Sequence, residues 1–226
     1  MKKTNSRAHG CGGMALALLL GSSCQAAITM TDIQIWAGSG PNQAALVIDW
    51  SDGGPALVWG FRWSDGATPN GTDMLMAVIG ADARLRVPGL NPSTNFINTI
   101  EFDADGNGIF ERSQSTSAGP YWGYVVNNDV YYDPVDFSLN SHIVPPNSTV
   151  VPNGNPYAEG SWIDSSTGIF DRPLVDGSWD GFAYGDFNLS TFTGPMPAVP
   201  IAAVSVPEPG MLWGAGLVLL AFYTRR

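Results

Sequence analysis

Short apolar runs separated by turn residues limit this chain to a β-rich fold more strongly than any other feature. The runs AALVIDW (44–50) and ALVWGFRW (56–63) are each about as long as one strand. Between them lies SDGGP, whose Asp-Gly and Gly-Pro steps are typical of a hairpin loop. β-Branched and aromatic residues recur in these runs, which favours strands over helices. The two runs are therefore expected to pair as a hairpin.

One short helix is expected at about residues 72–80. Thr72 is a candidate N-cap, Asp73 suits the positive N-terminal end, and Gly80 is a candidate end. Further strands are expected at ARLRV, NFINTIEF, YWGYVV and GFAYGDF, and a long surface loop at 140–157. The expected fold class is α+β and β-rich: mainly antiparallel sheet with this one helix, an N-terminal signal helix and a short C-terminal transmembrane helix.

The N-terminal end resembles a secretory signal peptide, residues 1–26. Basic residues precede the apolar run 14–20, and small residues follow it up to Ala26. Cleavage after Ala26 would remove Cys11 and Cys24, the two cysteines of the chain. The exported protein is then expected to have no disulfide and to depend on an ordinary hydrophobic core.

Residues 27–192 are expected to form one acidic domain outside the cytoplasm. Residues 27–206 contain five arginines against 19 acidic residues. Such a charge repels nucleic-acid phosphates, so no nucleic-acid partner is expected. It suits a solvated envelope protein, and two interpretations remain open: acidity for solubility, or acidity that collects divalent cations.

Prolines set the domain apart from the C-terminal end. They stand at 195, 197, 200, 207 and 209, which predicts a semi-rigid extended linker over 193–206. The last segment, 207–226, contains the apolar run 211–223. As a helix this run would span about 20 Å. A bilayer core is about 30 Å thick, so the run is short for a stable anchor.

The C-terminal end resembles the PEP-CTERM sorting signal of Gram-negative bacteria. The resemblance rests on three ordered parts: the motif, the apolar run and a basic end, formed by Val206, Pro207, Glu208, Pro209, Gly210, the run 211–223, and Arg225 and Arg226. It implies recognition by an exosortase, a membrane protease that cuts near the motif. The implied partners are exosortase, the secretion machinery and the membrane. The implied course is tethering at the inner membrane, then release to the cell surface, the medium or extracellular polysaccharide. The alternative is a permanent tail anchor.

DADGNGIFE (103–111) is the candidate metal site, and calcium is the one cofactor that the sequence suggests. Its alternate positions follow an EF-hand-like series, with Asp103, Asp105, Asn107, the backbone carbonyl of Ile109, and Glu111. Gly108 supplies the tight turn. Gln114 stands where a bidentate Glu is expected, and the flanks look extended rather than helical. The alternative is a polar hairpin tip.

Three aromatic residues on one strand face form a second candidate site. Trp59, Phe61 and Trp63 alternate with Gly60 and Arg62. They are interpreted either as a platform for a sugar or planar ligand or as a core stripe.

Catalytic groups are scarce, so no enzyme activity and no catalytic residues are expected. After removal of residues 1–26 the chain keeps no cysteine or lysine, and His142 is its one histidine. No nucleophile-elbow motif accompanies His142. A glycosidase-type carboxylate pair stays formally open.

Three functional hypotheses follow. The first is a non-enzymatic surface or matrix protein associated with polysaccharide or calcium. The second is a small-ligand module, because helix 72–80 between paired strands, followed by YWGYVVNN, resembles the β-grasp modules of cobalamin carriers. The third is an exported carbohydrate-active enzyme. A convex acidic surface would favour the surface or matrix protein. A concave aromatic pocket would favour the small-ligand module, and a cleft with two facing carboxylates would favour the enzyme.

Overall fold

The computed structural model describes residues 27–94, 96–116, 120–127, 152–165, 167–190 and 193–205. The expected signal peptide, His142, and the sorting signal with its apolar run 211–223 lie outside the described residues. Within the described ranges, no helix has the length and apolarity needed to cross a bilayer.

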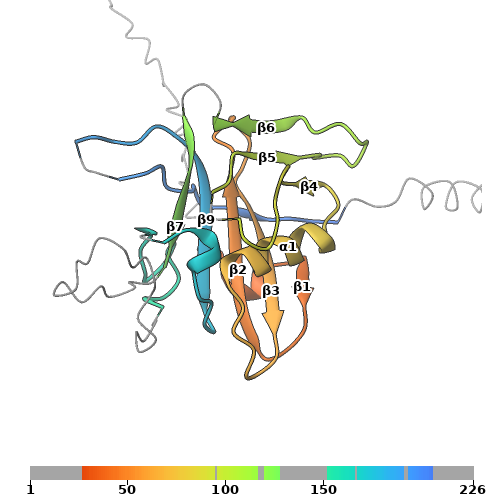
Figure 1. Cartoon of the computed structure of the whole chain (residues 1–226), viewed down its shortest axis with the longest axis vertical. Helices are drawn as coiled ribbons and strands as arrows, with labels where there is room; N and C mark the ends of the chain where they lie inside the picture. The colour runs from red at the N-terminus through yellow and green to blue at the C-terminus, as the bar shows by residue number, and fades with distance from the viewer. Residues whose placement is uncertain are drawn as a thin grey trace, which may run out of the picture.

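A mixed, seven-stranded sheet forms the middle of the domain (Figure 1). Its order is β1–β3–β2–β9–β7–β8, and β10 also pairs with β3. The strands are β1 (Trp36–Gly38), β2 (Asn42–Asp49), β3 (Leu57–Trp63), β7 (Tyr121–Val126), β8 (Ile163–Asp164), β9 (Ser178–Gly185) and β10 (Ile201–Ala202).

The strand pairing confirms the expected hairpin, and five of the eight strand pairings are antiparallel, so the described sheets are mainly antiparallel with an unexpected parallel part. β2 and β3 are antiparallel, with Val47 opposite Val58. However, β2 is parallel to β9, and both β1 and β10 are parallel to β3. Parallel neighbours need long connections, so these partners come from distant parts of the chain.

A second layer covers one face of the large sheet. It consists of α1 (Gly71–Ala81) and a three-stranded antiparallel sheet of β4 (Leu85–Arg86), β5 (Thr99–Phe102) and β6 (Arg112–Ser115). Figure 1 shows α1 in front of β2 and β3, with the small sheet beside it. Short 3₁₀ turns lie at η1 (Met30–Asp32) and η3 (Ile169–Asp171). The three strands that directly follow the helix, β4 to β6, thus form their own sheet and do not join β2 and β3.

The helix is confirmed, but its caps differ from the expected ones. Asn70 is the N-cap: its side chain accepts from the Asp73 backbone at 2.9 Å, while the Asp73 carboxylate accepts from the Asn70 backbone at 2.9 Å. This reciprocal capping box satisfies two helix-end donors. Thr72 lies inside the helix and donates its hydroxyl to the carbonyl oxygen of Thr94 at 3.0 Å. Gly80 is also helical, and Asp82 follows as the C-cap.

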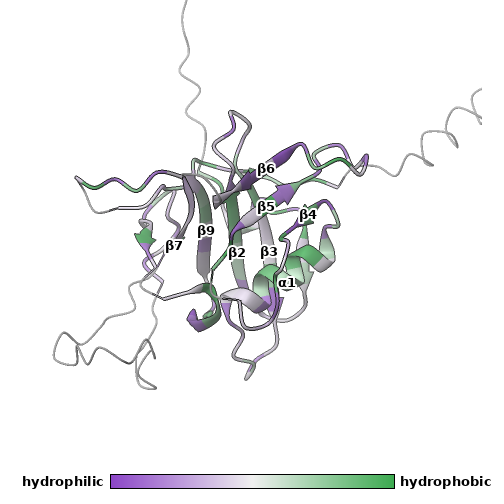
Figure 2. Ribbon diagram, turned by 45° about the horizontal axis from the view of Figure 1, so that its top comes forward, coloured by the Kyte–Doolittle hydropathy of each residue, from purple (hydrophilic) through white to green (hydrophobic). Residues whose placement is uncertain are grey.

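Apolar side chains are buried on both faces of the large sheet. One cluster joins the sheet to α1 and β5 through residues such as Trp50, Trp59, Leu75 and Phe102. A second cluster on the other face contains Val47, Val58 and Trp179 with the N-terminal residues Ile28 and Ile33. Figure 2 shows the corresponding hydrophobic colouring on β2 and α1. The large sheet is therefore the central layer of the domain and is covered on both faces.

The proline-rich segment packs against the domain rather than standing away from it as a spacer. The Ala198 backbone donates to Asp49 Oδ2 at 2.8 Å, β10 pairs with β3, and Ala203 is buried. A Cβ placed on Gly123 would lie 2.8 Å from Pro195, and one on Gly181 would lie 2.8 Å from Pro197. These glycines let the extended proline segment approach the sheet closely, so the described segment belongs to the fold as far as Ala203.

A charged network is buried between α1 and the large sheet. Arg172 Nη2 donates to Asp180 Oδ1 at 3.2 Å, and both side chains have 0% exposure. The Tyr124 hydroxyl donates to Asp180 Oδ2. Burial raises the pKa of Asp180, against the lowering effect of the Arg172 charge, and burial together with Asp180 raises the pKa of Tyr124 well above its usual value. The network joins η3, β7 and β9.

We expect Arg172→Met to destabilise the fold by about 3–5 kcal/mol, because it leaves a buried carboxylate without its counter-charge. Denaturant unfolding at neutral pH measures the loss. A raised folded-state pKa means that stability is lost as pH rises through it, so the deficit of the variant should shrink in acid.

The double variant Arg172→Met/Asp180→Asn is the matched control. It removes both charges but keeps an acceptor for Tyr124, so most of the lost stability should return. Equal unfolding free energies for the wild type and Arg172→Met would contradict the assigned role of this ion pair.

Candidate functional site

The candidate metal site is the loop of the β5–β6 hairpin (Figure 1). β5 ends at Phe102 and β6 begins at Arg112, which pair with each other and leave 103–111 as the loop. Gly106 and Gly108 have φ angles of 74° and 89°. This left-handed region favours glycine, so these two residues allow the chain to turn back tightly.

Asp103 organises the loop from its first position. Its Oδ1 accepts from the backbone of Gly106 at 2.8 Å and of Asn107 at 3.1 Å, and its Oδ2 accepts from Gly108 at 2.7 Å. Only 4% of the residue is exposed. Desolvation opposes ionisation, but the backbone donors outweigh it and lower the pKa of Asp103 below the usual 3.8.

Three of the five predicted ligands converge in the structure, whereas the side-chain oxygen of Asn107 accepts from the Ile109 backbone at 2.7 Å. Single oxygen atoms of Asp103, Asp105 and Glu111 lie within 4.8 Å of one another. Asn107 Nδ2 donates to Asp105 Oδ2 at 2.9 Å and to Glu111 Oε1 at 3.3 Å. The neutral amide NH2 group of Asn107 thus lies between the two carboxylates, in the place that a divalent cation would take. The side chain of Ile109 is 65% exposed, which fits its expected contribution through the backbone alone.

Gln114, which stands where an EF-hand has its last ligand, lies within β6 opposite Ile100. Its backbone carbonyl accepts from Trp122 Nε1 at 3.2 Å. The flanks are strands, as their sequence suggests, so any ion site is confined to the hairpin loop and does not extend into a helix pair.

The loop is fixed to the rest of the domain at both ends. Arg112 donates to both carboxylate oxygens of Asp52 at 2.8 Å, and its guanidinium lies 4.4 Å from the Trp50 ring centroid. Hydrogen bonding by Arg112 lowers the pKa of Asp52. Arg86 stacks 3.9 Å from the ring centroid of Phe110. The carboxylates thus project from a braced hairpin.

The candidate aromatic platform is part of the core. Trp59, Phe61 and Trp63 are 0%, 8% and 7% exposed. They face α1 and the small sheet, and Trp59 Nε1 donates to Asp82 Oδ2 at 2.9 Å. Arg62 on the opposite strand face stacks on Trp36 at 4.2 Å. These rings do not form an exposed platform, because the second layer covers their side of β3.

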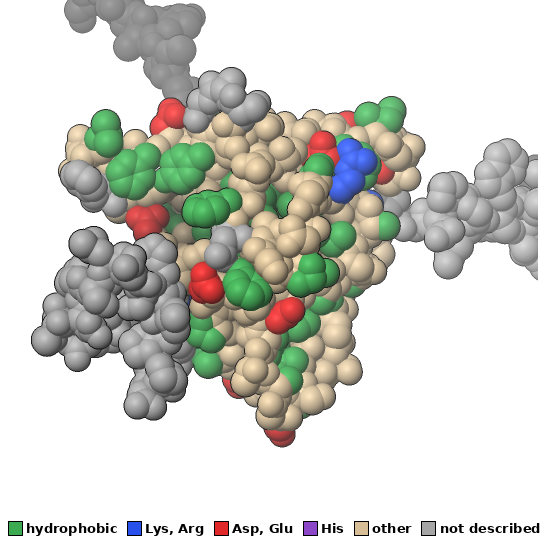
Figure 3. All heavy atoms as spheres, viewed as in Figure 1, with side chains coloured by type: hydrophobic (Ala, Val, Ile, Leu, Met, Phe, Trp, Pro, Cys, Tyr) green, Lys and Arg blue, Asp and Glu red, His purple; other side chains and the backbone are tan. Residues whose placement is uncertain are grey.

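A different group of aromatic residues lines an open cleft of about 640 Å³. The cleft lies beside β7. Within the described residues, β8 pairs with β7 only at Val125 and Val126. Its aromatic lining consists of Phe96, Tyr121, Trp122, Tyr124, Phe182 and Phe187. In Figure 3 hydrophobic side chains gather on the β7 side of the face, among acidic ones. A volume of this size is typical of small-ligand sites.

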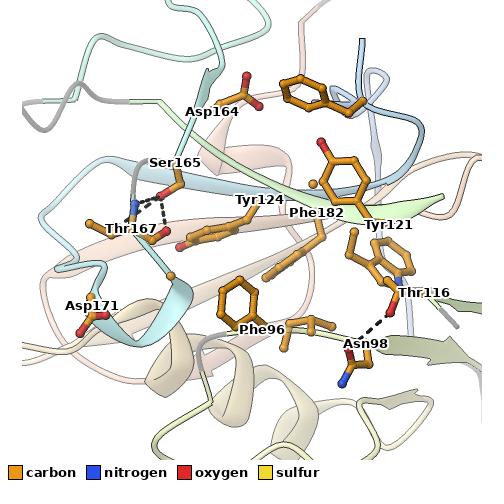
Figure 4. Close-up of a pocket in the computed structure, with 15 residues that line it drawn as sticks. Phe96, Asn98, Thr116, Tyr121, Tyr124, Asp164, Ser165, Thr167, Asp171 and Phe182 are labelled. Atoms are coloured by element: carbon orange, nitrogen blue, oxygen red, sulfur yellow. Dashed lines mark hydrogen bonds between the residues drawn. The ribbon is translucent and has the colours of Figure 1, made fainter. Parts of the chain in front are cut away.

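Polar and acidic groups stand between the rings. Asn98 and Thr116 contact each other at 3.3 Å, and the Ser165 hydroxyl donates to the Thr167 carbonyl oxygen at 2.8 Å. Asp164 accepts from the Gly194 backbone at 3.1 Å. Figure 4 shows these side chains around an opening that also faces the rings of Phe96, Tyr124 and Phe182. The cleft combines flat apolar faces with hydrogen-bonding groups.

The aromatic cleft was missed in the sequence because four separate segments build it. YWGYVV (121–126) was assigned as a strand, but nothing local shows that Phe96 and Phe187 come beside it. The expected strands NFINTIEF and GFAYGDF contain Phe96 and Phe187, but β5 begins only at Thr99 and β9 ends at Gly185, so both rings lie in loops beside the cleft.

Comparisons with known proteins identify the C-terminal end alone. Neither a curated protein nor a solved structure matches the chain. The β-grasp resemblance is therefore not supported, and β4, β5 and β6 form a separate sheet in which β5 pairs with both of the others. Residues 205–226 match the family model described as "PEP-CTERM protein-sorting motif". This match covers all seven residues expected to form the signal, so the chain is a protein that carries a PEP-CTERM sorting motif at its C-terminal end.

Proposed function

We propose that this chain is an exosortase-sorted, non-enzymatic protein of the bacterial cell surface or extracellular matrix, and that its exported domain binds calcium. The observation that carries the sorting role is the motif match at 205–226. The non-enzymatic role is supported by the residue content: beyond Ala26 the sequence contains no cysteine or lysine and a single histidine, His142.

The sorting motif follows closely after a buried residue of the domain. Ala203 is buried and its backbone donates to the Val58 carbonyl oxygen at 3.0 Å. Val204 and Ser205 alone separate it from the Val206-Pro207-Glu208-Pro209-Gly210 motif. A protease cutting at the motif would therefore work directly beside a folded domain, and release would leave that domain almost without a tail.

In cells with the exosortase, we expect a released protein that has lost both residues 1–26 and the end containing Arg226. Intact-mass spectrometry of the medium and of membranes, with and without the exosortase gene, measures this. Glu208→Ala should hold the protein in the membrane fraction, whereas Val204→Ala, just outside the motif, should leave release unchanged. Arg226 retained on the released protein would contradict processing.

Calcium binding is supported by the spacing and convergence of the loop carboxylates. Asp103, Asp105 and Glu111 bring oxygens within 4.8 Å of one another from alternate loop positions. Three carboxylates so close repel one another, and a hard divalent cation with oxygen ligands relieves that repulsion. Extracellular calcium modules bind with dissociation constants of about 10⁻⁴–10⁻³ M, and an exported domain meets calcium in that range.

We expect calcium at about 10 mM to stabilise the full-length protein by about 1.4–2.7 kcal/mol, for a dissociation constant in that range. Differential scanning calorimetry should show Tm rising by several degrees. Asp105→Asn and Glu111→Gln preserve shape and should abolish the rise. Asp186→Asn, which removes an exposed carboxylate elsewhere, should keep it. An unchanged wild-type Tm would refute the site.

The calcium effect should also depend on pH. Ligand carboxylates must be ionised to bind a cation. Because the pKa of Asp103 lies below 3.8 and an ordinary glutamate has a pKa of about 4.3, the rise in Tm should persist down to about pH 5 and fade in stronger acid. Calorimetry at fixed calcium over a pH series measures this, and a rise that already vanishes between pH 7 and 5 would implicate other groups.

A second candidate function is ligand binding. The concave aromatic cleft beside β7 favours it, since this feature separates a ligand-binding module from a purely structural one.

A further inference from the structure

We propose that the aromatic cleft beside β7 binds a short stretch of a neutral polysaccharide. The inference rests on the proposed export, because such polymers surround a protein at the cell surface. It names a ligand class for a site that shares no residue with the calcium loop or the sorting motif.

Two phenylalanines at the cleft provide flat apolar faces that water does not favour. Phe96 is 84% exposed and Phe187 is 41% exposed. Large exposed aromatic rings that gather in one concave site mark ligand or partner surfaces. A pyranose ring has an apolar face of C–H groups and an edge of hydroxyls. It can therefore cover such a phenyl ring while its hydroxyls stay hydrogen-bonded.

The floor of the cleft is held in place before any ligand arrives. The Tyr124 ring stacks on Phe182 with centroids 4.9 Å apart and an angle of 24° between planes. The Tyr124 hydroxyl is fixed by the buried Asp180, which is in turn paired with Arg172. A ring already fixed in its bound position loses little conformational entropy on binding, so the floor adds affinity at small cost.

Polar groups around the rings match the hydroxyl edge of a sugar. Asn98 and Thr116 stand on one side of the cleft, and Ser165 and Asp164 on another (Figure 4). Amide, hydroxyl and carboxylate groups all accept or donate to sugar hydroxyls. Asn98 uses its side-chain oxygen for Thr116, so a wholly apolar ligand would remove water from the Asn98 NH2 group without offering it an acceptor, which is unfavourable. The mixture therefore favours a saccharide over a hydrophobic small molecule.

The negative charge of the cleft lining favours neutral over anionic polysaccharides. Asp164 and Asp171 contribute carboxylates to the lining, and no Lys or Arg stands among the described lining residues. An anionic polymer would bring like charges together, and such juxtaposition opposes binding. The cleft is therefore assigned to uncharged sugar units.

The test uses the full-length protein in a detergent without a sugar headgroup. The probes are cellohexaose, maltohexaose, laminarihexaose and chitohexaose, with hexagalacturonate as the anionic counterpart of similar length. Isothermal titration calorimetry measures binding in calcium and in a chelator. We expect at least one neutral hexasaccharide to bind and hexagalacturonate to bind at least about tenfold more weakly.

Substitution of the two exposed phenylalanines tests whether the hexasaccharide binds in the cleft. Phe96→Ala and Phe187→Ala should each weaken binding by roughly tenfold, since both rings would form the contact surface. Val199→Ala removes another exposed apolar side chain, outside the cleft, and should leave binding unchanged. Because Phe96 is almost fully exposed, its removal should not disturb folding, which the far-UV circular dichroism spectrum checks.

Several outcomes would overturn the proposal. These are no binding by any neutral hexasaccharide, equal binding of hexagalacturonate, or unchanged binding in both phenylalanine variants. Binding of the apolar dye Nile red that is lost in Phe96→Ala, with no sugar bound, would assign the cleft to a hydrophobic ligand instead. None of these results bears on calcium-dependent stability or exosortase-dependent release, so failure here leaves the proposed sorting and calcium roles standing.

Discussion

The whole architecture depends on one strand that is buried on both faces and paired along both edges. Within β2, residues Ala44 to Ile48 have 0% exposure, and the strand lies between β3 and β9. Alternate side chains of a strand point to opposite faces. Since both sets are apolar here, the sheet needs a covering layer on each side. The helix with the small sheet covers one face, and the N-terminal and proline-rich segments cover the other.

This division places the functional features on different layers. The β5–β6 hairpin belongs to the helix-side layer, and its loop holds the buried carboxylate of Asp103 and the exposed carboxylates of Asp105 and Glu111. The cleft forms where the sheet pairing of β7 gives way to side chains from other segments. The proline-rich layer instead leads the chain along the sheet to the sorting motif. A short signal therefore follows directly from a structural element, and Gly123 and Gly181 are the residues that make that close approach sterically feasible.

Features set by neighbouring residues were predictable, and features set by distant contacts were not. The β2–β3 hairpin, α1 and the convergence of the 103–111 loop follow from turn residues, capping groups and spacing within short windows. The parallel pairing of β2 with β9 joins residues over 130 positions apart, with Ala44 opposite Ser178, and no local pattern encodes it. Proline content correctly excluded a helix at 193–205, but whether an extended segment is a spacer or a cover depends on the glycines of other strands. The cleft was also not predictable from the sequence, because residues that are distant in the chain form it.

Pairing with arginine offsets part of the negative charge of this acidic domain. Arg84, Arg86, Arg112 and Arg172 each pair with one carboxylate, and Arg62 stacks on Trp36. All five arginines of residues 27–206 are thus engaged in the fold, where they brace the hairpin, the helix end and the buried network. The remaining carboxylates far outnumber them. Salt screens the repulsion among exposed carboxylates. That repulsion is strong in the 103–111 loop, because three carboxylates there bring oxygens within 4.8 Å of one another on a hairpin that Arg112 holds against Asp52.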